Sequence, residues 1–265
     1  MPGRYRVTTA SIPLARKALL EDLLPLAREA GKIIMEVYAT DFAVRGKADR
    51  SPVTEADEKA EAVILSGLVQ LTPEIPIVSE EAAAEGRIPV VGETFWLVDP
   101  LDGTREFVNR NGEFTVNIAL IDDGVPVAGV VFAPAPGELY AGSIGAGAFV
   151  EDIGGRRAIA CALVSDRALV VVSSRSHGDA EQLEQFLAGR SVASSITVGS
   201  SLKFCLLACG KADLYPRLGR TMEWDTAAGH AVLLAAGGRV TDLAGQALRY
   251  GKPDFVNPHF VASGV

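Results

Sequence analysis

Two aspartates lie three positions apart at the end of an apolar run in the segment WLVDPLDGT, residues 96–104. These residue types can serve a turn alone, because Pro100 restricts φ and an Asp-Gly pair favours tight reversal. Alternatively, the turn directs the carboxylates of Asp99 and Asp102, with the Leu101 carbonyl, toward one cation. Hard cations such as Mg²⁺ prefer oxygen ligands of this kind.

Other acidic residues recur at the ends of predicted elements. Glu80 and Glu81 end the predicted strand PIVSEE, Asp57 lies in the first turn of a predicted helix, and Asp225 follows Trp224 at another helix start. Each alone has an ordinary explanation as a helix cap or a solvated charge. Together they predict one acidic pocket that holds several metal ions, because uncompensated carboxylates close together are costly.

Metal ions would reverse the local charge and let an acidic protein bind a phosphate ester. Gly103 and Thr104 follow the two aspartates. If a helix begins there, its first backbone amides would point at a phosphate oxygen, and the Thr104 hydroxyl would orient the attacking water. Two or more cations favour in-line hydrolysis of a phosphate ester, because they promote nucleophile formation and stabilise the leaving group.

The first half of the chain predicts two helices followed by an antiparallel sheet. Apolar residues at helical spacing predict a helix over 14–38, which Pro25 should bend or divide. A second helix is predicted over 54–71. Apolar runs around turn signals such as the Asp-Gly pair at 123–124 predict five or six strands between about 76 and 151. Helices beside a sheet indicate an α+β layer.

The second half predicts alternating strands and helices, which indicate an α/β layer. The polar, glycine-rich segment 151–160 separates the two patterns. We therefore predict an N-terminal α+β domain over 1–152, with most of the metal ligands, and a C-terminal α/β domain over 153–265, with Asp225 and the segments that set specificity.

Composition excludes several classes of protein. A net charge of -8 argues against nonspecific binding to nucleic acid or anionic membranes. Cys161, Cys205 and Cys209 form no CxxC pair, so a disulfide framework or structural zinc site is not expected. No apolar run approaches the ~20 residues of a membrane span, and the first residues make a poor signal peptide. We expect a cytoplasmic protein, at most peripheral on the inner membrane, and either monomer or homodimer.

Three motifs, S-E-E at 79–81, W-L-V-D-P-L-D-G-T at 96–104 and W-D-T-A-A-G at 224–229, resemble the inositol monophosphatase superfamily of Mg²⁺-dependent, lithium-sensitive phosphatases. The segments 51–57 and 105–121 look more narrowly like its CysQ branch, the 3'(2'),5'-bisphosphate nucleotidases. The resemblance spans essentially the whole chain. It implies an α/β fold, a layered αβαβα sandwich, and removal of the 3'-phosphate of adenosine 3',5'-bisphosphate, a by-product of sulfate assimilation, to give AMP and phosphate.

The resemblance also implies roles for individual residues. Asp57 would pair with Thr104 to activate the attacking water and help hold a third Mg²⁺ through water, while Gly103 and Thr104 would bind the scissile phosphate. Glu81 would act only indirectly. The residues implied as ligands of two Mg²⁺ ions are Glu80, Asp99 and the Leu101 carbonyl for one, and Asp99, Asp102 and Asp225 for the other. Those implied to border the substrate as well are Glu80, Leu101, Asp102 and Asp225.

The segments SSRSH and GSSLKF resemble nucleotide-contacting segments of the same branch, which implies substrate contacts for His177, Ser200 and Lys203. Ser200 is predicted to open a helix, and Lys203 to supply positive charge for a non-reacting phosphate. The alternative is an ordinary N-cap, a solvated lysine and a loop histidine. Arg217 is a further phosphate candidate, and Arg105 stands where the resemblance leads us to expect lysine.

Two other functions remain open from the sequence. A sugar phosphatase of the same superfamily would act on inositol monophosphate or fructose 1,6-bisphosphate, and Ser200, Lys203 and His177 would then matter less. A noncatalytic regulator would bind metal and nucleotide without turnover. The presence of both Asp57 and Thr104 argues against the regulator.

Overall fold

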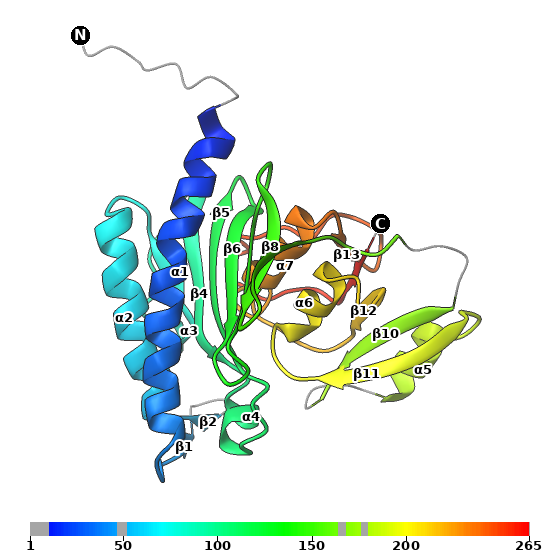
Figure 1. Ribbon diagram of the computed structural model, residues 1–265, viewed down its shortest axis with the longest axis horizontal. Helices are drawn as coiled ribbons and strands as arrows, with labels where there is room; N and C mark the ends of the chain where they lie inside the picture. The colour runs from blue at the N-terminus through cyan, green and yellow to red at the C-terminus, as the bar shows by residue number, and fades with distance from the viewer. Residues whose placement is uncertain (1–10, 47–51, 164–167, 176–179, 265) are drawn as a thin grey trace.

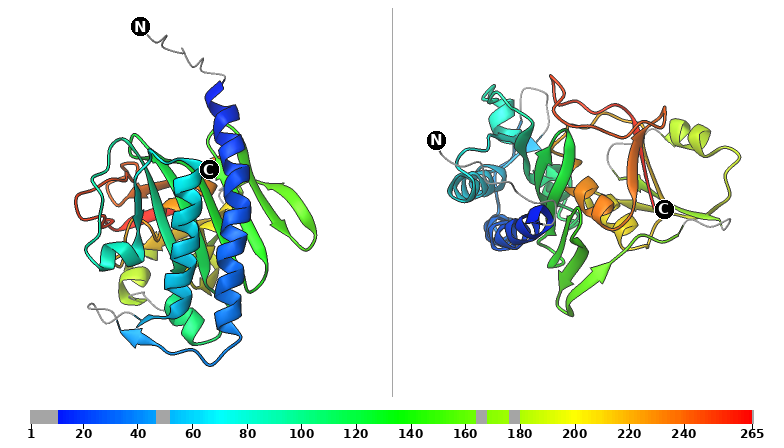
Figure 2. Two further views of the ribbon diagram at one scale, coloured as in Figure 1. Left: turned by 90° about the vertical axis from the view of Figure 1, so that its left-hand side faces the viewer. Right: turned by 90° about the horizontal axis from the view of Figure 1, so that it is seen from above.

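The protein has five layers in the order helix, sheet, helix, sheet, helix (Figure 1). The computed structural model describes residues 11–46, 52–163, 168–175 and 180–264. One outer layer contains α1 and α2, a seven-stranded sheet follows, α6 and α7 lie between the sheets, and α5 lies beyond the five-stranded sheet (Figures 1 and 2). The predicted αβαβα architecture is therefore confirmed.

The first layer consists of two helices that cover one face of the larger sheet. Helix α1 spans Ser11–Tyr38 and α2 spans Glu55–Leu71. Pro25 does not divide α1. Its exposed position explains this, because water can satisfy the carbonyl that loses its hydrogen bond. A short pair of strands, β1 (Arg45–Gly46) and β2 (Pro52–Val53), precedes α2.

The larger sheet has the order β3-β4-β5-β6-β7-β8-β9, and only the β3–β4 pair is parallel. A hairpin reverses at 123–124, where both residues have positive φ, as the Asp-Gly signal predicts. The strands are β3 (Ile77–Ser79), β4 (Thr94–Asp102), β5 (Thr115–Asp122), β6 (Val125–Ala133), β7 (Glu138–Ser143), β8 (Gly147–Asp152) and β9 (Gly155–Ile159). Two short helices, α3 (Glu80–Ala84) and α4 (Thr104–Val108), flank β4.

The smaller sheet has the order β11-β10-β12-β14-β13. Strand β10 is parallel to β11 and β12, whereas β14 is antiparallel to its neighbours. Its strands and the remaining helices are β10 (Leu169–Ser174), α5 (Ala180–Leu187), β11 (Val192–Val198), α6 (Leu202–Ala208), β12 (Leu214–Arg217), α7 (Ala227–Ala235), β13 (Arg239–Asp242) and β14 (Phe260–Ser263).

The larger sheet extends beyond the domain boundary predicted at 152/153. That boundary falls at the start of the turn between β8 and β9, and β9 adds a seventh strand to the same sheet. The chain therefore passes from one sheet to the other after Ile159. A division into two domains remains a prediction.

Helix α7 packs directly on the larger sheet, and this contact fixes one end of the functional site. A Cβ added to Gly129 in β6 would lie 2.8 Å from both the Ala228 oxygen and the Ala231 Cβ. Only glycine permits this approach. The turn before α7, which contains Asp225, is thereby held against the larger sheet.

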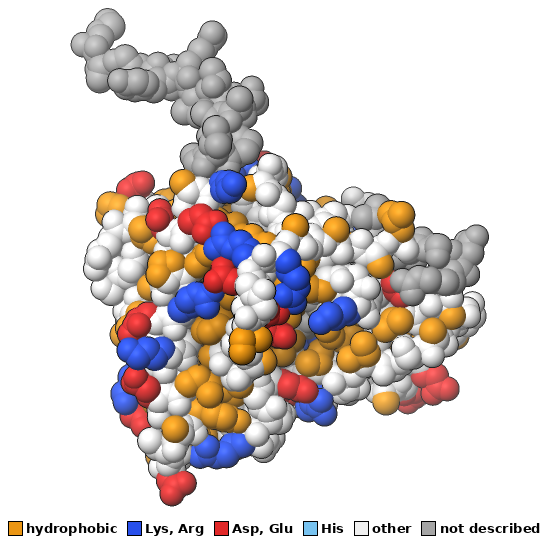
Figure 3. All heavy atoms as spheres, viewed as in Figure 1, with side chains coloured by type: hydrophobic (Ala, Val, Ile, Leu, Met, Phe, Trp, Pro, Cys, Tyr) orange, Lys and Arg blue, Asp and Glu red, His pale blue; other side chains and the backbone are white. Residues whose placement is uncertain are grey.

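Charged side chains of both signs are interspersed over the face that carries α1 and the β8–β9 hairpin (Figure 3). Arg156 in β9 makes a double contact with Glu21 in α1, at 2.6 and 3.1 Å. Across the described part of the chain, no helix is long and apolar enough to cross a membrane. The three cysteines are free thiols, as the sequence predicts.

Candidate active site

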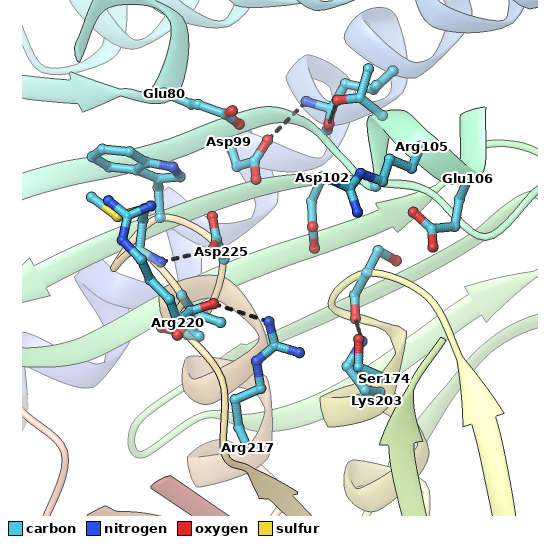
Figure 4. A pocket seen from close by; sticks show the side chains of 18 of the residues that line it. Glu80, Asp99, Asp102, Arg105, Glu106, Ser174, Lys203, Arg217, Arg220 and Asp225 are labelled. Carbon is cyan, nitrogen blue, oxygen red and sulfur yellow. Dashed lines mark hydrogen bonds between the residues drawn. The ribbon is translucent and has the colours of Figure 1, made fainter. Parts of the chain in front are cut away.

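The four candidate metal ligands Glu80, Asp99, Asp102 and Asp225 are among the carboxylates that line one cavity of about 470 Å³ between the two sheets. Asp99 and Asp102 come from the end of β4, and Asp225 from the turn before α7 (Figure 4). Glu80 opens α3. The prediction that Glu80 and Glu81 end a strand is wrong, because β3 ends at Ser79 and both glutamates lie in the first turn of α3. Acidic residues favour this position, since the N-terminal end of a helix carries partial positive charge. Glu81 is buried in α3 outside the cavity lining.

An irregularity in β4 brings Asp99 and Asp102 to the same side of the sheet. Residues three apart on a regular strand face opposite sides. Here Asp99 pairs with Asn117 and Asp102 pairs with Thr115, so β4 contains one extra residue. Such a bulge redirects the side chains that follow it. Pro100 is tolerated there because an unpaired bulge residue loses no ladder hydrogen bond when it lacks an N–H.

Asp99 is buried, whereas Glu80, Asp102 and Asp225 are partly exposed, and the carboxylates repel one another. Burial, followed by the charges of Glu80 and Asp102, holds the pKa of Asp99 well above its usual range. The same causes, burial first and then Asp102 and Glu80, raise the pKa of Asp225 to about 8. Burial raises the pKa of Asp102 to about 6, against the opposing effect of Lys203. Ionisation of all these carboxylates is therefore unfavourable in the absence of bound cations.

The donor set suits Mg²⁺, since every candidate ligand is an oxygen and the negative charges of the carboxylates raise one another's pKa. Within the described ranges, no three His, Cys, Asp or Glu side chains are close enough to form a preassembled metal-binding group. Their mutual effect on pKa shows that they lie within electrostatic reach of one another. Cations bound by these oxygens would relieve this repulsion.

Asp57 and Thr104 are in contact, as the resemblance implies. The Thr104 hydroxyl lies 3.2 Å from Asp57 Oδ1 and 3.3 Å from the Leu101 carbonyl oxygen. Asp57 Oδ2 accepts hydrogen bonds of 2.8 Å from both the amide and the hydroxyl of Thr54. This capping box at the start of α2 fixes the orientation of the Asp57 carboxylate.

Gly103 occupies a left-handed conformation with φ of 91°, directly before α4 begins at Thr104. The helix start predicted here is therefore confirmed. An added Cβ would lie 3.0 Å from the Glu113 carbonyl oxygen and 3.4 Å from Ser200 Cβ. Both the dihedral angle and the packing require glycine at this position.

Ser200 does not open α6, which has Ser201 at its N-cap and begins at Leu202. Ser200 has φ of 49°, a conformation that non-glycine residues rarely adopt. Its hydroxyl is buried without a hydrogen-bond partner among the described residues. A strained backbone and a hydroxyl of this kind at a cavity wall are features of binding sites.

Lys203 is not a solvated lysine, because only 5% of it is exposed. Its ammonium group donates to the Val198 carbonyl at 3.3 Å and to the Ser200 carbonyl. Burial lowers its pKa to about 8. Arg217 is also buried on the cavity wall, and its Nη2 donates to the Arg220 carbonyl at 3.1 Å. His177 lies outside the described residues.

The loop before α7 also differs from the sequence-based interpretation. Asp225 is not the N-cap of this helix; Thr226 holds that position. Asp225 Oδ2 instead accepts a hydrogen bond of 2.8 Å from the Met222 amide. This bond orients the carboxylate toward the cavity, where Figure 4 shows it opposite Asp102.

Sequence reasoning missed Asn117 and Ser201, which connect the two halves of the site. Asn117 Nδ2 donates to Asp102 Oδ2 at 3.3 Å and to Ser201 Oγ at 3.0 Å, and Ser201 Oγ donates to the Asp225 carbonyl at 2.8 Å. The available signal was an asparagine inside the apolar strand TVNIALID. A buried amide usually serves a specific partner.

The five-layer fold and its carboxylate cavity define a class of metal-dependent enzymes to which sequence comparison also assigns the chain. The model of the inositol monophosphatase family matches residues 17–263. The chain belongs to this family, which is metal-dependent. The resemblance stated from the motifs is confirmed.

Particular relatives narrow the comparison. The chain is 50% identical over 249 residues to the 3'(2'),5'-bisphosphate nucleotidase CysQ of Escherichia coli O157:H7, which covers 92% of this chain and 99% of the relative. CysQ from Bacteroides thetaiotaomicron, a bacterial member of the family, is 38% identical with a TM-score of 0.77 and covers 93% of this chain and 97% of that one. An inositol monophosphatase from Anabaena is 25% identical, with a TM-score of 0.74 and coverage of 94% and 91%.

Proposed function

We propose that the protein is a Mg²⁺-dependent 3'(2'),5'-bisphosphate nucleotidase that hydrolyses the 3'-phosphate of adenosine 3',5'-bisphosphate to give AMP and phosphate. The observation that carries this proposal is one cavity that combines the carboxylates described above with the buried cations Lys203 and Arg217. The carboxylates suit metal ions for the reacting phosphate. The cations suit a second phosphate that does not react. The 50% identity to a CysQ nucleotidase supports the same substrate class.

In this proposal each of two Mg²⁺ ions is held by oxygen ligands. Bound Mg²⁺ supplies Lewis acidity and offsets the charge of the phosphate group. A third ion near Asp57 is part of the proposal. The ligands are Glu80, Asp99 and the Leu101 carbonyl for one ion, and Asp99, Asp102 and Asp225 for the other.

The protein's own residues orient and deprotonate the attacking water. The Thr104 hydroxyl accepts a hydrogen bond from this water and passes its own proton toward Asp57 Oδ1, 3.2 Å away. Because Thr54 holds the other Asp57 oxygen with two hydrogen bonds, Oδ1 stays directed at Thr104. The backbone amides of Gly103 and Thr104 bind the scissile phosphate.

The second phosphate distinguishes a nucleotidase from an inositol phosphatase. Ser200 offers a buried hydroxyl without a partner among the described residues, and Lys203 and Arg217 offer charges within the same cavity. A cation that is already desolvated gains strongly from an anionic ligand. Contact between His177 and the nucleotide is proposed from resemblance alone.

Phosphate release from a panel of substrates tests this function. Adenosine 3',5'-bisphosphate should be hydrolysed in Mg²⁺, with inhibition by EDTA and by Li⁺. Inositol 1-phosphate and fructose 1,6-bisphosphate, which match the alternative functions, should be turned over with much lower kcat/KM. Preference for inositol 1-phosphate would contradict the nucleotidase proposal, and nucleotide binding without turnover would identify a regulator. The cytoplasmic location and the choice between monomer and homodimer stay predictions.

A further inference from the structure

Glu113 joins the two halves of the molecule beside the site. It lies in the loop between α4 and β5, and its carboxylate accepts three hydrogen bonds from the other half. Arg175, directly after β10, donates through Nε and Nη2, both at 2.7 Å. The amide of Gly199, directly after β11, donates at 2.8 Å. The Arg175 guanidinium and the Gly199 amide lower the pKa of Glu113, so the carboxylate is ionised near neutral pH.

The segment β10–α5–β11 is anchored elsewhere mainly through β10, whose Val171 and Val172 are buried and whose Val170 exchanges two hydrogen bonds of 2.8 Å with Asp213. Helix α5 has no buried residue, and β11 is an edge strand. The register between β10 and β12 contains one residue pair, Val171 with Leu214. The contacts of Glu113 add a further anchor at the ends of β10 and β11 that lead toward the site.

Glu113 also packs against the loops of both proposed phosphate sites. An added Cβ on Gly199 would lie 2.7 Å from Glu106 Cγ and 2.8 Å from the Glu113 carbonyl oxygen. The Glu113 carbonyl oxygen also packs against Gly103, where an added Cβ would lie 3.0 Å from it. Glu113 is thus enclosed between the loop of the scissile phosphate and the loop that leads to Ser200.

We infer that Glu113 is a positioning residue that holds Ser200 and Lys203 at the correct distance from Gly103 and Thr104, so that one bisphosphate can engage both sites. This inference rests on the proposed function, because it assumes a substrate with two phosphates. Glu113 does not line the cavity and contacts no reacting atom. Its effect is on the affinity for the second phosphate rather than on the chemical step.

Stability alone does not explain this arrangement. The side chains of Glu113 and Arg175 are 23% and 44% exposed, and ion pairs at such positions add little to folding. A matched pair is present elsewhere: Glu21 and Arg156 make a similar double contact at 42% and 40% exposure, far from the site. Glu21→Ala is therefore the control for Glu113→Ala.

Steady-state kinetics with adenosine 3',5'-bisphosphate in saturating Mg²⁺ test the inference. Glu113→Ala should raise KM about tenfold and leave kcat within about twofold, since a charged hydrogen-bond network that positions a ligand group is lost. The inhibition constant of inorganic phosphate, which needs only the scissile-phosphate site, should not change. Arg175→Lys, which keeps the Gly199 contact and one charge, should shift KM in the same direction by less. Glu21→Ala should change neither constant.

Three results would overturn the inference. An unchanged KM in Glu113→Ala would show that the contact does not position the second site. If KM for the bisphosphate and the inhibition constant of phosphate rose by the same factor, the substitution would have damaged the site in general. A fall in kcat with KM unchanged would also indicate general damage. A wild-type protein that does not hydrolyse the bisphosphate would refute the proposed function itself, which separates the two failures.

Discussion

Asp225→Asn should stabilise the metal-free protein while it removes activity. The pKa of Asp225 is raised to about 8 in the folded protein by burial and by Asp102 and Glu80. A carboxyl group with a higher pKa in the folded state favours folding only while it is protonated. Its contribution is therefore fully retained below about pH 4, the usual pKa of aspartate, and is lost as the pH rises toward 8.

The size of the effect follows from the two pKa values. Each pH unit between the unfolded pKa and the working pH costs about 1.4 kcal/mol, so ionisable Asp225 destabilises the metal-free fold by about 1.5 kcal/mol at pH 5 and at most about 4 kcal/mol at pH 7. Asparagine keeps an oxygen that can accept the 2.8 Å hydrogen bond from the Met222 amide. The substitution therefore removes the charge without loss of this bond.

Urea denaturation in EDTA at pH 5 and pH 7 measures this difference. The variant should gain free energy of unfolding over the wild type, and the gain should be larger at pH 7 by about 2 to 3 kcal/mol. Saturating Mg²⁺ should stabilise the wild type more than the variant. Asp254→Asn, at an exposed carboxylate on the cavity edge, is the control. An equal gain at both pH values, or none, would refute the electrostatic reasoning.

Two further substitutions test other parts of the site. Thr104→Ala should lower kcat about 10² to 10³-fold, because it removes the hydroxyl that links water to Asp57, whereas Thr104→Ser should retain most activity; equal kcat values for the two variants would contradict this role. Gly103→Ala should lower both activity and melting temperature, since φ of 91° and a 3.0 Å contact oppose any Cβ. Steady-state kinetics and thermal melting measure these effects. A fully active, stable Gly103→Ala protein would show that the loop can relax.

Local sequence signals predicted the elements that contain their own turn and cap residues. The Asp-Gly pair at 123–124 and the helix from Glu55 each depend on neighbouring residues, so pattern reasoning found them. Strands β13 and β14 were missed because their pairing joins residues that are distant in sequence and their apolar runs are short.

Prediction of the site from sequence is also limited to features that depend on neighbouring residues. The motif at 96–104 contains its ligand candidates within one turn, and so its side chains could be chosen from sequence. Their common direction depends on a bulge against β5, which only the pairing reveals. Asn117, Ser201 and the Glu113 contacts bridge segments that are 62 to 86 residues apart. No local pattern indicates such links, because each donor looks like an ordinary polar residue.

The burial of Lys203 could not be predicted for the same reason. A lysine in the first turn of a helix is usually solvated, but here the carbonyls of Val198 and Ser200 accept hydrogen bonds from its ammonium group. The left-handed turn at Ser200 brings one of these carbonyls to it. The sequence indicated the charge, and the fold determined where it acts.

The proposed function requires Glu80, Asp99, Asp102 and Asp225 to hold the Mg²⁺ ions with which a nucleotide 3'-phosphate is hydrolysed. Phosphate release from adenosine 3',5'-bisphosphate by wild type and Asp99→Asn, each in Mg²⁺ and in EDTA, tests it most directly. The wild type should be active only with Mg²⁺, and the variant should fold but release no phosphate above background in either condition. Hydrolysis by wild type in EDTA, or by Asp99→Asn in Mg²⁺ at a rate near that of the wild type, would contradict the account.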